Sequence, residues 1–250
     1  MMRALVYAAL GTMFTFLMTT LGAAMVFVLG RNTYPHSQAT MLGFAGGVMT
    51  AASVWSLLLP AIEQTDGTST PTWMPAAVGM ALGAVFLAGL DTLLPRLRRR
   101  TDPMHRQNSL LFTAITLHNI PEGMAVGLAF ALAADGEGFA GAAALALGIG
   151  IQNFPEGAAI SLPLRQMGES PWRSFIDGTF SGIVEPLFGV AVVFIATNAY
   201  GLMPWLLSFA AGAMLYVVID ELVPQSNTRG GVCGFMIGFL MMMTLDVALG

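Results

Sequence analysis

Two short stretches of the sequence place metal-ligating side chains inside apolar surroundings. Residues 116–126 read TLHNIPEGMAV, and residues 150–160 read GIQNFPEGAAI. In a helix, His118 and Glu122 are four residues apart, so an imidazole and a carboxylate share one face within reach of one cation. Gln152 and Glu156 repeat this spacing. The doubled pattern therefore predicts a cation site built by two helices.

Further polar residues extend the predicted site. Asn119 and Asn153 directly follow the first ligand of each motif in the sequence. They are rotated by about 100° around the helix, so they can bind a cation at a neighbouring position. Pro121 and Pro155 lack an N–H, so each is expected to bend its helix and free a carbonyl. The stretch SGIVEPLFG adds Glu185. Three carboxylates repel one another unless a cation or protons compensate, and a set of oxygen and nitrogen ligands without thiolate suits Zn²⁺, Fe²⁺, Mn²⁺ or Cd²⁺.

The composition indicates that these residues lie in a membrane. Of 250 residues, 56% are hydrophobic and only 10% are charged, against about 25% charged in soluble domains. All ten basic residues are arginine, and nothing resembles a nucleic-acid-binding surface. We predict an all-α integral membrane protein in the lipid bilayer, a single transmembrane domain spanning residues 1–250. Eight apolar segments are each near the ~20 residues that a spanning helix needs: 4–29, 39–62, 73–95, 109–134, 138–164, 174–198, 202–224 and 230–249.

A signal peptide is the competing interpretation of the first apolar segment. The apolar region of a signal peptide has only about 7–15 residues, and the run after Arg3 is much longer. We therefore count residues 4–29 as a true span.

The arginines predict the orientation of the chain. If there are eight spans, only Arg3 falls on one side of the membrane. Positive residues favour the cytoplasmic side, so both termini are expected to be extracytoplasmic. The other nine arginines all fall on the opposite side: Arg31, Arg96, Arg98, Arg99, Arg100, Arg106, Arg165, Arg173 and Arg229.

The two motifs resemble the paired signatures of the ZIP family of divalent-metal transporters, bacterial branch. HNIPEG and QNFPEG match its fourth and fifth spans, and GVMTAASVWSLLLPAIE, GLDTLLP, SGIVEP and VIDELVP resemble its second, third, sixth and seventh spans. The sequence departs from many members at Gln152, where they carry His, and at Asp220-Glu221, where they carry His-Glu.

This resemblance implies the fold and the activity. It implies eight helices in a 3+2+3 inverted-repeat arrangement, a homodimer, and the movement of divalent metal, zinc above all, into the cytoplasm across a bacterial inner membrane. The metal is the substrate, and no organic cofactor is expected. The resemblance implies metal at His118, Asn119, Glu122, Gln152, Asn153, Glu156 and Glu185, and the depth of the motifs places this site near mid-membrane. Two carboxylates shared between neighbouring positions would allow two metals side by side.

Other polar residues are candidates for the path to and from this site. Glu63 and Asp246 lie near the ends of spans on the predicted outer side, where they can attract cations. Met49 and Ser56 match family positions beside the central site, although Met49 is also a good packing residue. The candidates for an exit at the inner side are Asp91, Asp220 and Glu221.

Three other functions use the same residues. An ion channel would conduct through them, an intramembrane metalloenzyme would add an activated water and a base, and a structural protein would use them only for hydrogen bonds. The absence of an HExxH motif disfavours the enzyme. Three glutamates next to prolines disfavour the structural role, because each ionisable group costs about 2.5–3.5 kcal/mol on insertion.

Overall fold

The computed structural model describes residues 2–28, 35–66, 69–97, 103–133, 138–166, 168–198 and 200–249. Within these ranges the side chains of residues 35–38, 94–97, 103–115, 118, 197 and 200 lie outside the description.

The described chain is helical throughout and contains no strand. Six helical stretches are long and apolar enough to cross a membrane: Met2–Phe27, Ala39–Thr65, Trp73–Leu93, Pro171–Ala196, Met203–Gln225 and Arg229–Leu249. These stretches confirm the prediction of an all-α integral membrane protein. They include the first apolar run, which was predicted to be a true span.

Three of the six stretches are largely single helices: α1 (Met2–Ala24, extended by η1, Met25–Phe27), α4 (Trp73–Leu97) and α11 (Arg229–Leu249). The two motif-bearing helices are α5 (Pro103–Leu132) and α6 (Phe139–Gln166). Both remain continuous through their internal prolines, Pro121 in α5 and Pro155 in α6.

Two stretches contain a turn of π-helix. The second stretch consists of α2 (Pro35–Ala52), the π-turn η2 (Ser53–Leu58) and α3 (Leu59–Thr65). The seventh predicted span consists of α9 (Met203–Val217), the π-turn η5 (Val218–Leu222) and α10 (Val223–Gln225), preceded by η4 (Tyr200–Leu202). Pro60 and Pro224 each follow the π-turn by two residues and cannot donate to the carbonyl four residues earlier. The wider turn accommodates this loss, and such turns often occur at functional sites.

The predicted span at 174–198 is interrupted. It consists of α7 (Pro171–Ser181) and α8 (Val184–Asn198), and a turn separates them at Gly182 and Ile183. Pro186 explains the break, because its ring clashes with the carbonyl of Gly182 and removes a helical hydrogen bond. Glu185 therefore lies in the first turn of a new helix.

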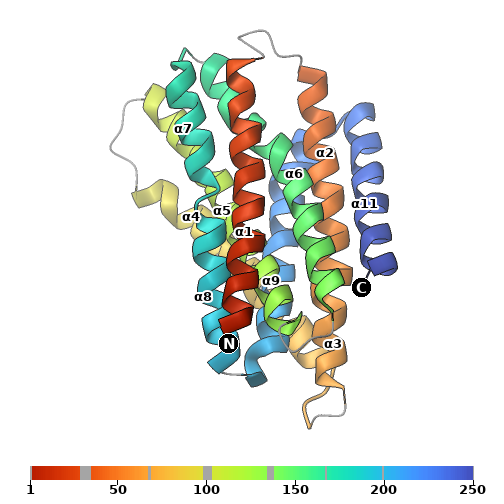
Figure 1. Ribbon diagram of the computed structural model, residues 1–250. Coiled ribbons are helices and arrows are strands. Elements are labelled where there is room, and N and C mark those ends of the chain that lie inside the picture. The colour runs from red at the N-terminus through yellow and green to blue at the C-terminus, as the bar shows by residue number, and fades with distance from the viewer. Residues whose placement is uncertain are drawn as a thin grey trace.

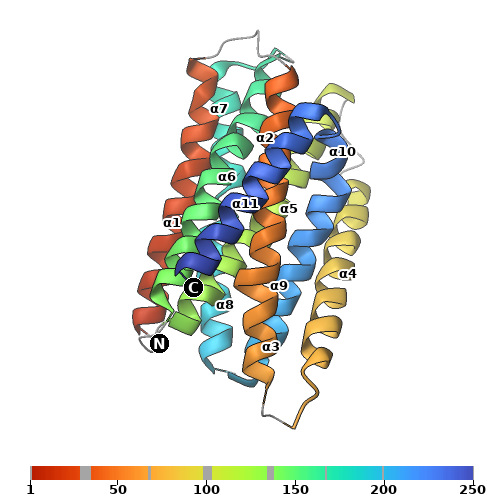
Figure 2. The same ribbon diagram turned by 90° about the vertical axis from the view of Figure 1, so that its right-hand side faces the viewer.

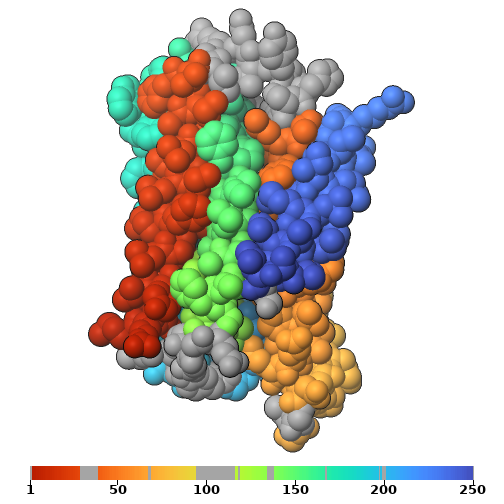
Figure 3. Space-filling view, turned by 45° about the vertical axis from the view of Figure 1, so that its right-hand side comes forward, coloured from red at the N-terminus to blue at the C-terminus, as the bar shows by residue number. Residues whose placement is uncertain are grey.

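Figures 1 and 2 show the helices as one elongated bundle. Helix α1 packs most extensively against α6, and α5 packs against α8. On the other side, α2 pairs with α11 and α4 pairs with α9. Figure 3 shows α6 in green between α1 in red and α11 in blue. The motif-bearing helices α5 and α6 are thus flanked by two sets of partners.

The described arginines lie at the ends of the bundle. Arg165 ends α6, and Arg173 and Arg229 begin α7 and α11, all at the upper end of Figures 1 and 2. Arg3 begins α1 at the lower end, where the C-terminus also points. The remaining arginines of the orientation argument lie outside the described side chains.

Glycines allow the closest helix contacts. A Cβ added at Gly83 of α4 would lie 2.0 Å from the backbone oxygen of Phe209 in α9, and one added at Gly212 of α9 would lie 2.0 Å from the backbone oxygen of Met80. Because the obstacles are backbone atoms, side-chain rotation cannot relieve these clashes. The pair α4 and α9 is therefore held at a distance that only glycine permits.

Gly83→Ala is expected to destabilise the protein by about 1–3 kcal/mol, the usual cost of overpacking. Gly89→Ala in the same helix is the matched control, because a Cβ there meets nothing within 4 Å. The melting temperatures of the two variants, purified in detergent, check this expectation. Equal melting temperatures would show that the close helix contact at Gly83 does not determine the stability of the protein.

Candidate metal centre

The three motif-bearing segments bring their polar side chains into the interior of the bundle. Helix α5 supplies Asn119 and Glu122, α6 supplies Gln152, Asn153 and Glu156, and α8 supplies Glu185. None of these six side chains is more than 4% exposed. Burial of so many polar groups among apolar helices is costly unless their hydrogen bonds or charges are satisfied.

The glycine after each motif glutamate explains how these helices approach one another. A Cβ added at Gly123 would lie 2.4 Å from the backbone oxygen of Glu185 in α8. A Cβ added at Gly157 would lie 2.0 Å from the backbone oxygen of Thr19 in α1. In the Pro-Glu-Gly triplet of each motif, the glutamate is the candidate ligand, and the glycine lets the helix contact its neighbour directly.

An amide connects the carboxylates of the two motifs. The side-chain nitrogen of Gln152 donates to Oε1 of Glu122 and lies 3.5 Å from Oε1 of Glu156. The predicted pairing of α5 and α6 is therefore present in the structure. Gln152 gives each carboxylate a donor and leaves the second oxygen of each without one.

The two asparagines also donate through their side-chain nitrogens. Nδ2 of Asn153 lies 2.9 Å from Oε2 of Glu185 and 3.4 Å from the backbone oxygen of Thr15. Nδ2 of Asn119 donates to the backbone oxygen of Ser181 over 2.9 Å. All three amides of the cluster thus bind protein acceptors through their nitrogen atoms.

Five buried oxygens of the cluster accept no hydrogen bond in the described structure. They are Oδ1 of Asn119, Oε2 of Glu122, Oε1 of Gln152, Oδ1 of Asn153 and Oε2 of Glu156. A buried acceptor without a partner costs about 1–3 kcal/mol, and more when the group is charged. Such a set of acceptors suits a cation, because a metal ion binds oxygen lone pairs directly.

His118, the predicted nitrogen ligand, is in α5, but its side chain lies outside the described residues. Among the side chains that the structure does describe, no three His, Cys, Asp or Glu residues form a metal-binding group by themselves. A cation bound by the described cluster would therefore need the amide oxygens of Asn and Gln as well as the carboxylates.

The carboxylates of the cluster influence one another electrostatically. Glu122 interacts with both Glu156 and Glu185, and Glu156 also interacts with Glu221. Three buried carboxylates in mutual repulsion favour a positive charge between them. The interaction with Glu221 connects the centre with the predicted exit residues.

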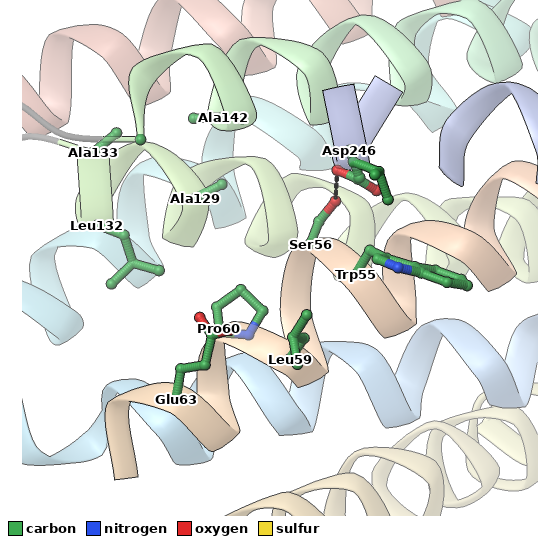
Figure 4. A pocket seen from close by; sticks show the side chains of 13 residues that line it. Trp55, Ser56, Leu59, Pro60, Glu63, Ala129, Leu132, Ala133, Ala142 and Asp246 are labelled. Carbon is green, nitrogen blue, oxygen red and sulfur yellow. Dashed lines mark hydrogen bonds between the residues drawn. The ribbon is translucent and has the colours of Figure 1, made fainter. Parts of the chain in front are cut away.

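A pocket of about 500 Å³ lies at the other end of the predicted path (Figure 4). Its lining includes Ser56, Glu63 and Asp246, three of the predicted access residues. Oγ of Ser56 in the π-turn η2 donates to Oδ1 of Asp246 in α11 over 2.6 Å. Oδ2 of Asp246 has no partner among the described residues. The structure thus brings these three residues together.

The remaining access residues occupy two places. Met49 is fully buried in the core. Asp91, Asp220 and Glu221 each lie within electrostatic reach of the Tyr216 hydroxyl. Asp220 and Glu221 lie in the π-turn η5, and Ser56 lies in the π-turn η2.

The sequence analysis missed the contribution of α1. Thr15 and Thr19 of this helix face the cluster, and Thr19 donates to Oε1 of Glu185 over 3.2 Å. It also missed the carbonyl of Ser181, which binds Asn119. The spacing of Thr12, Thr15 and Thr19 on one helix face was the available signal for α1.

The fold and this site define a class: an all-helical integral membrane protein with a buried, acceptor-rich centre suited to a cation. The model of the ZIP zinc transporter family matches residues 107–246, which is more than half of the chain. The chain therefore belongs to the ZIP family, a family of transporters rather than of enzymes.

The chain resembles relatives from animals and bacteria along nearly its whole length. It is 36% identical to zinc transporter ZIP11 of Homo sapiens, covering 97% of both chains. It is 37% identical to zinc transporter GufA of Myxococcus xanthus, covering 93% of this chain and 94% of the relative. It is also 37% identical to zinc transporter ZIPB of Bordetella bronchiseptica, covering 98% of this chain and 82% of the relative.

The electrostatics of the cluster predict the effect of removing one charge. With a chelator present at pH 8, Glu156→Gln should raise the melting temperature, because it removes repulsion and keeps the shape of the side chain. The control is Glu63→Gln, because Glu63 is exposed and the melting temperature should barely change. A lower melting temperature of Glu156→Gln would indicate a cluster that serves stability instead of cation binding.

Proposed function

We propose that this protein transports divalent metal cations, with zinc as the main substrate and iron, manganese and cadmium as further substrates. The observation that carries the proposal is the set of five unpartnered, buried oxygens on α5 and α6. The names of the relatives, all zinc transporters, support zinc as the substrate.

The ligand chemistry supports a transition metal. Carboxylate and amide oxygens, with the imidazole that His118 adds in this proposal, match the mixed ligands that zinc accepts. Five free oxygens exceed what one four-coordinate zinc ion requires. We therefore include two neighbouring metal positions in the proposal, with Glu122 and Glu156 shared between them and Glu185 as a further ligand.

The proposed topology has eight spans, with α5 and α6 as the fourth and fifth, in one transmembrane unit. The flanking helices support an inverted repeat: α2 pairs with α11 as α9 pairs with α4, and each repeat has one π-turn. We propose that the arginine-bearing end faces the cytoplasm of a bacterial cell, with both termini outside the plasma membrane and the protein as a homodimer.

The proposed path begins at the Ser56–Glu63–Asp246 pocket and ends at Asp91, Asp220 and Glu221. The burial of the centre supports a carrier that alternates its access, because an ion cannot reach those side chains without a change of conformation. Metal would enter the cytoplasm when the outer pocket is closed and these three inner residues are accessible.

Transport assays on purified protein test the centre. Glu122→Ala in proteoliposomes should lower zinc uptake at least about tenfold, since it removes a shared ligand. Glu169→Gln, a change at a surface ion pair with Arg173, is the control and should transport like the parent. Uptake by Glu122→Ala at the parent rate would overturn the site assignment.

The same liposomes test the substrate and the kind of transport. Iron, manganese and cadmium added in a competition series should each reduce zinc uptake. Saturating, strongly temperature-dependent flux supports a carrier, whereas unitary currents would support a channel.

The outer pocket predicts a different kinetic effect. Asp246→Asn should raise the KM for zinc several-fold and leave kcat nearly unchanged, because it weakens cation capture without touching the central ligands. A fall in kcat with unchanged KM would contradict the entry role.

A further inference from the structure

Helix α1 presents a row of buried hydroxyls to the metal-binding helices. Thr12, Thr15 and Thr19 are at most 1% exposed. The hydroxyl of Thr12 bonds to the backbone oxygen of Ala8, and that of Thr15 bonds to the backbone oxygen of Thr12. Bonds of this kind satisfy a threonine within its own helix, although the Thr15 side chain also contributes to the hydrogen bonding of Glu185.

The hydroxyl of Thr19 reaches another helix as well as its own backbone. Its Oγ1 lies 3.2 Å from Oε1 of Glu185 and 3.3 Å from the backbone oxygen of Thr15. The two partners compete for one proton, and a carboxylate is the stronger acceptor. Thr19 is therefore a donor to Glu185.

Glu185 is held at both of its oxygens. Oε1 accepts from Thr19, and Oε2 accepts from Asn153 over 2.9 Å. By contrast, Glu122 and Glu156 each keep one oxygen without a donor. Two donors from two helices fix the plane of the Glu185 carboxylate, and each oxygen keeps a lone pair for a metal ion.

The backbone geometry makes this contact possible. A Cβ at Gly157 would lie 2.0 Å from the backbone oxygen of Thr19, and a Cβ at Gly22 would lie 1.9 Å from the backbone oxygen of Phe154. Helices α1 and α6 therefore touch through their backbones at the threonine and at Gly22, three residues beyond it. This contact holds the Thr19 hydroxyl at a fixed depth beside the cluster.

We propose that Thr19 is a positioning residue of the metal centre, which orients the Glu185 carboxylate for the cation from outside the set of ligands. The inference rests on the proposed function and deepens it, since it adds α1 to the centre. Groups that orient metal ligands in this way typically change metal affinity about 10- to 100-fold when they are removed.

The test measures zinc affinity of the purified full-length protein by competition with a chromophoric chelator. Thr19→Val, which keeps the shape and removes the hydroxyl, should raise the Kd about 10- to 100-fold. Thr19→Ser, which keeps the hydroxyl, should restore an affinity close to that of the parent. Thr12→Val is the matched control in the same helix and should bind zinc like the parent.

A double-mutant cycle separates positioning from a general structural effect. In a Glu185→Ala background, Thr19→Val should cause no further loss of affinity, because Thr19 acts through that carboxylate. The same loss in both backgrounds, or parent affinity in Thr19→Val itself, would overturn the inference. If Thr19→Val does not fold, Thr19→Ala enters the same cycle with the same criteria.

Glu122→Ala distinguishes the failure of this inference from the failure of the proposed function. Parent-like zinc affinity in Glu122→Ala would remove the central site and, with it, the role of Thr19. Lost affinity in Glu122→Ala together with parent affinity in Thr19→Val would leave the site standing and remove only the role of Thr19.

Discussion

The structure depends on how the buried amides at the crossing of α5 and α6 are oriented. Each of the three amides gives its nitrogen to a protein acceptor, so each carbonyl oxygen is left toward the cluster without a donor. Two carboxylates contribute one free oxygen each. A cluster that served only stability would be expected to pair donors with acceptors, because an unpaired buried acceptor lowers stability. The excess of acceptors therefore favours a role in binding, and such a cost is common at functional sites.

This orientation in turn requires backbones in close contact. Gln152 joins two carboxylates because α5 and α6 cross at the motifs, and Asn153 reaches α8 and α1 because Gly157 and Gly123 leave no side chain between the helices. Membrane helices commonly use small residues in this way, since lipid provides little hydrophobic drive for their association. The break between α7 and α8 also helps to form the cluster. It exposes the carbonyl of Ser181 to Asn119 and starts a new helix just before Glu185.

The sequence predicted the elements that depend on local pattern. Long apolar runs predicted the spanning helices, and the spacing of Glu122, Gln152 and Glu156 predicted that two helices would share one polar cluster. The π-turns were not predicted, because a proline two residues beyond a turn is equally compatible with a kink or a break. The interruption before Glu185 was not predicted for the same reason, since Pro186 is compatible with a kink as well as with a break. The contribution of α1 to the cluster was not predicted, because a threonine on an apolar helix usually bonds to its own backbone, as Thr12 does. Thr19 differs from Thr12 in its tertiary contacts, the bond to Glu185 and the approach of Gly157.

In the proposed inverted repeat, the two ends of the proposed path differ in chemistry. The π-turns η2 and η5 precede Pro60 and Pro224 by the same number of residues, so Ser56 in one corresponds to Asp220 in the other, and Leu57 corresponds to Glu221. The outer pocket contains the hydroxyl of Ser56 with the carboxylates of Glu63 and Asp246, whereas Asp91, Asp220 and Glu221 lie near Tyr216 at the other end of the proposed path. More carboxylates at one position attract a doubly charged ion more strongly. In the proposed orientation, an ion would therefore meet carboxylates at the entry, at the buried centre and at the exit, and each of them lowers the cost of moving a doubly charged ion through the protein.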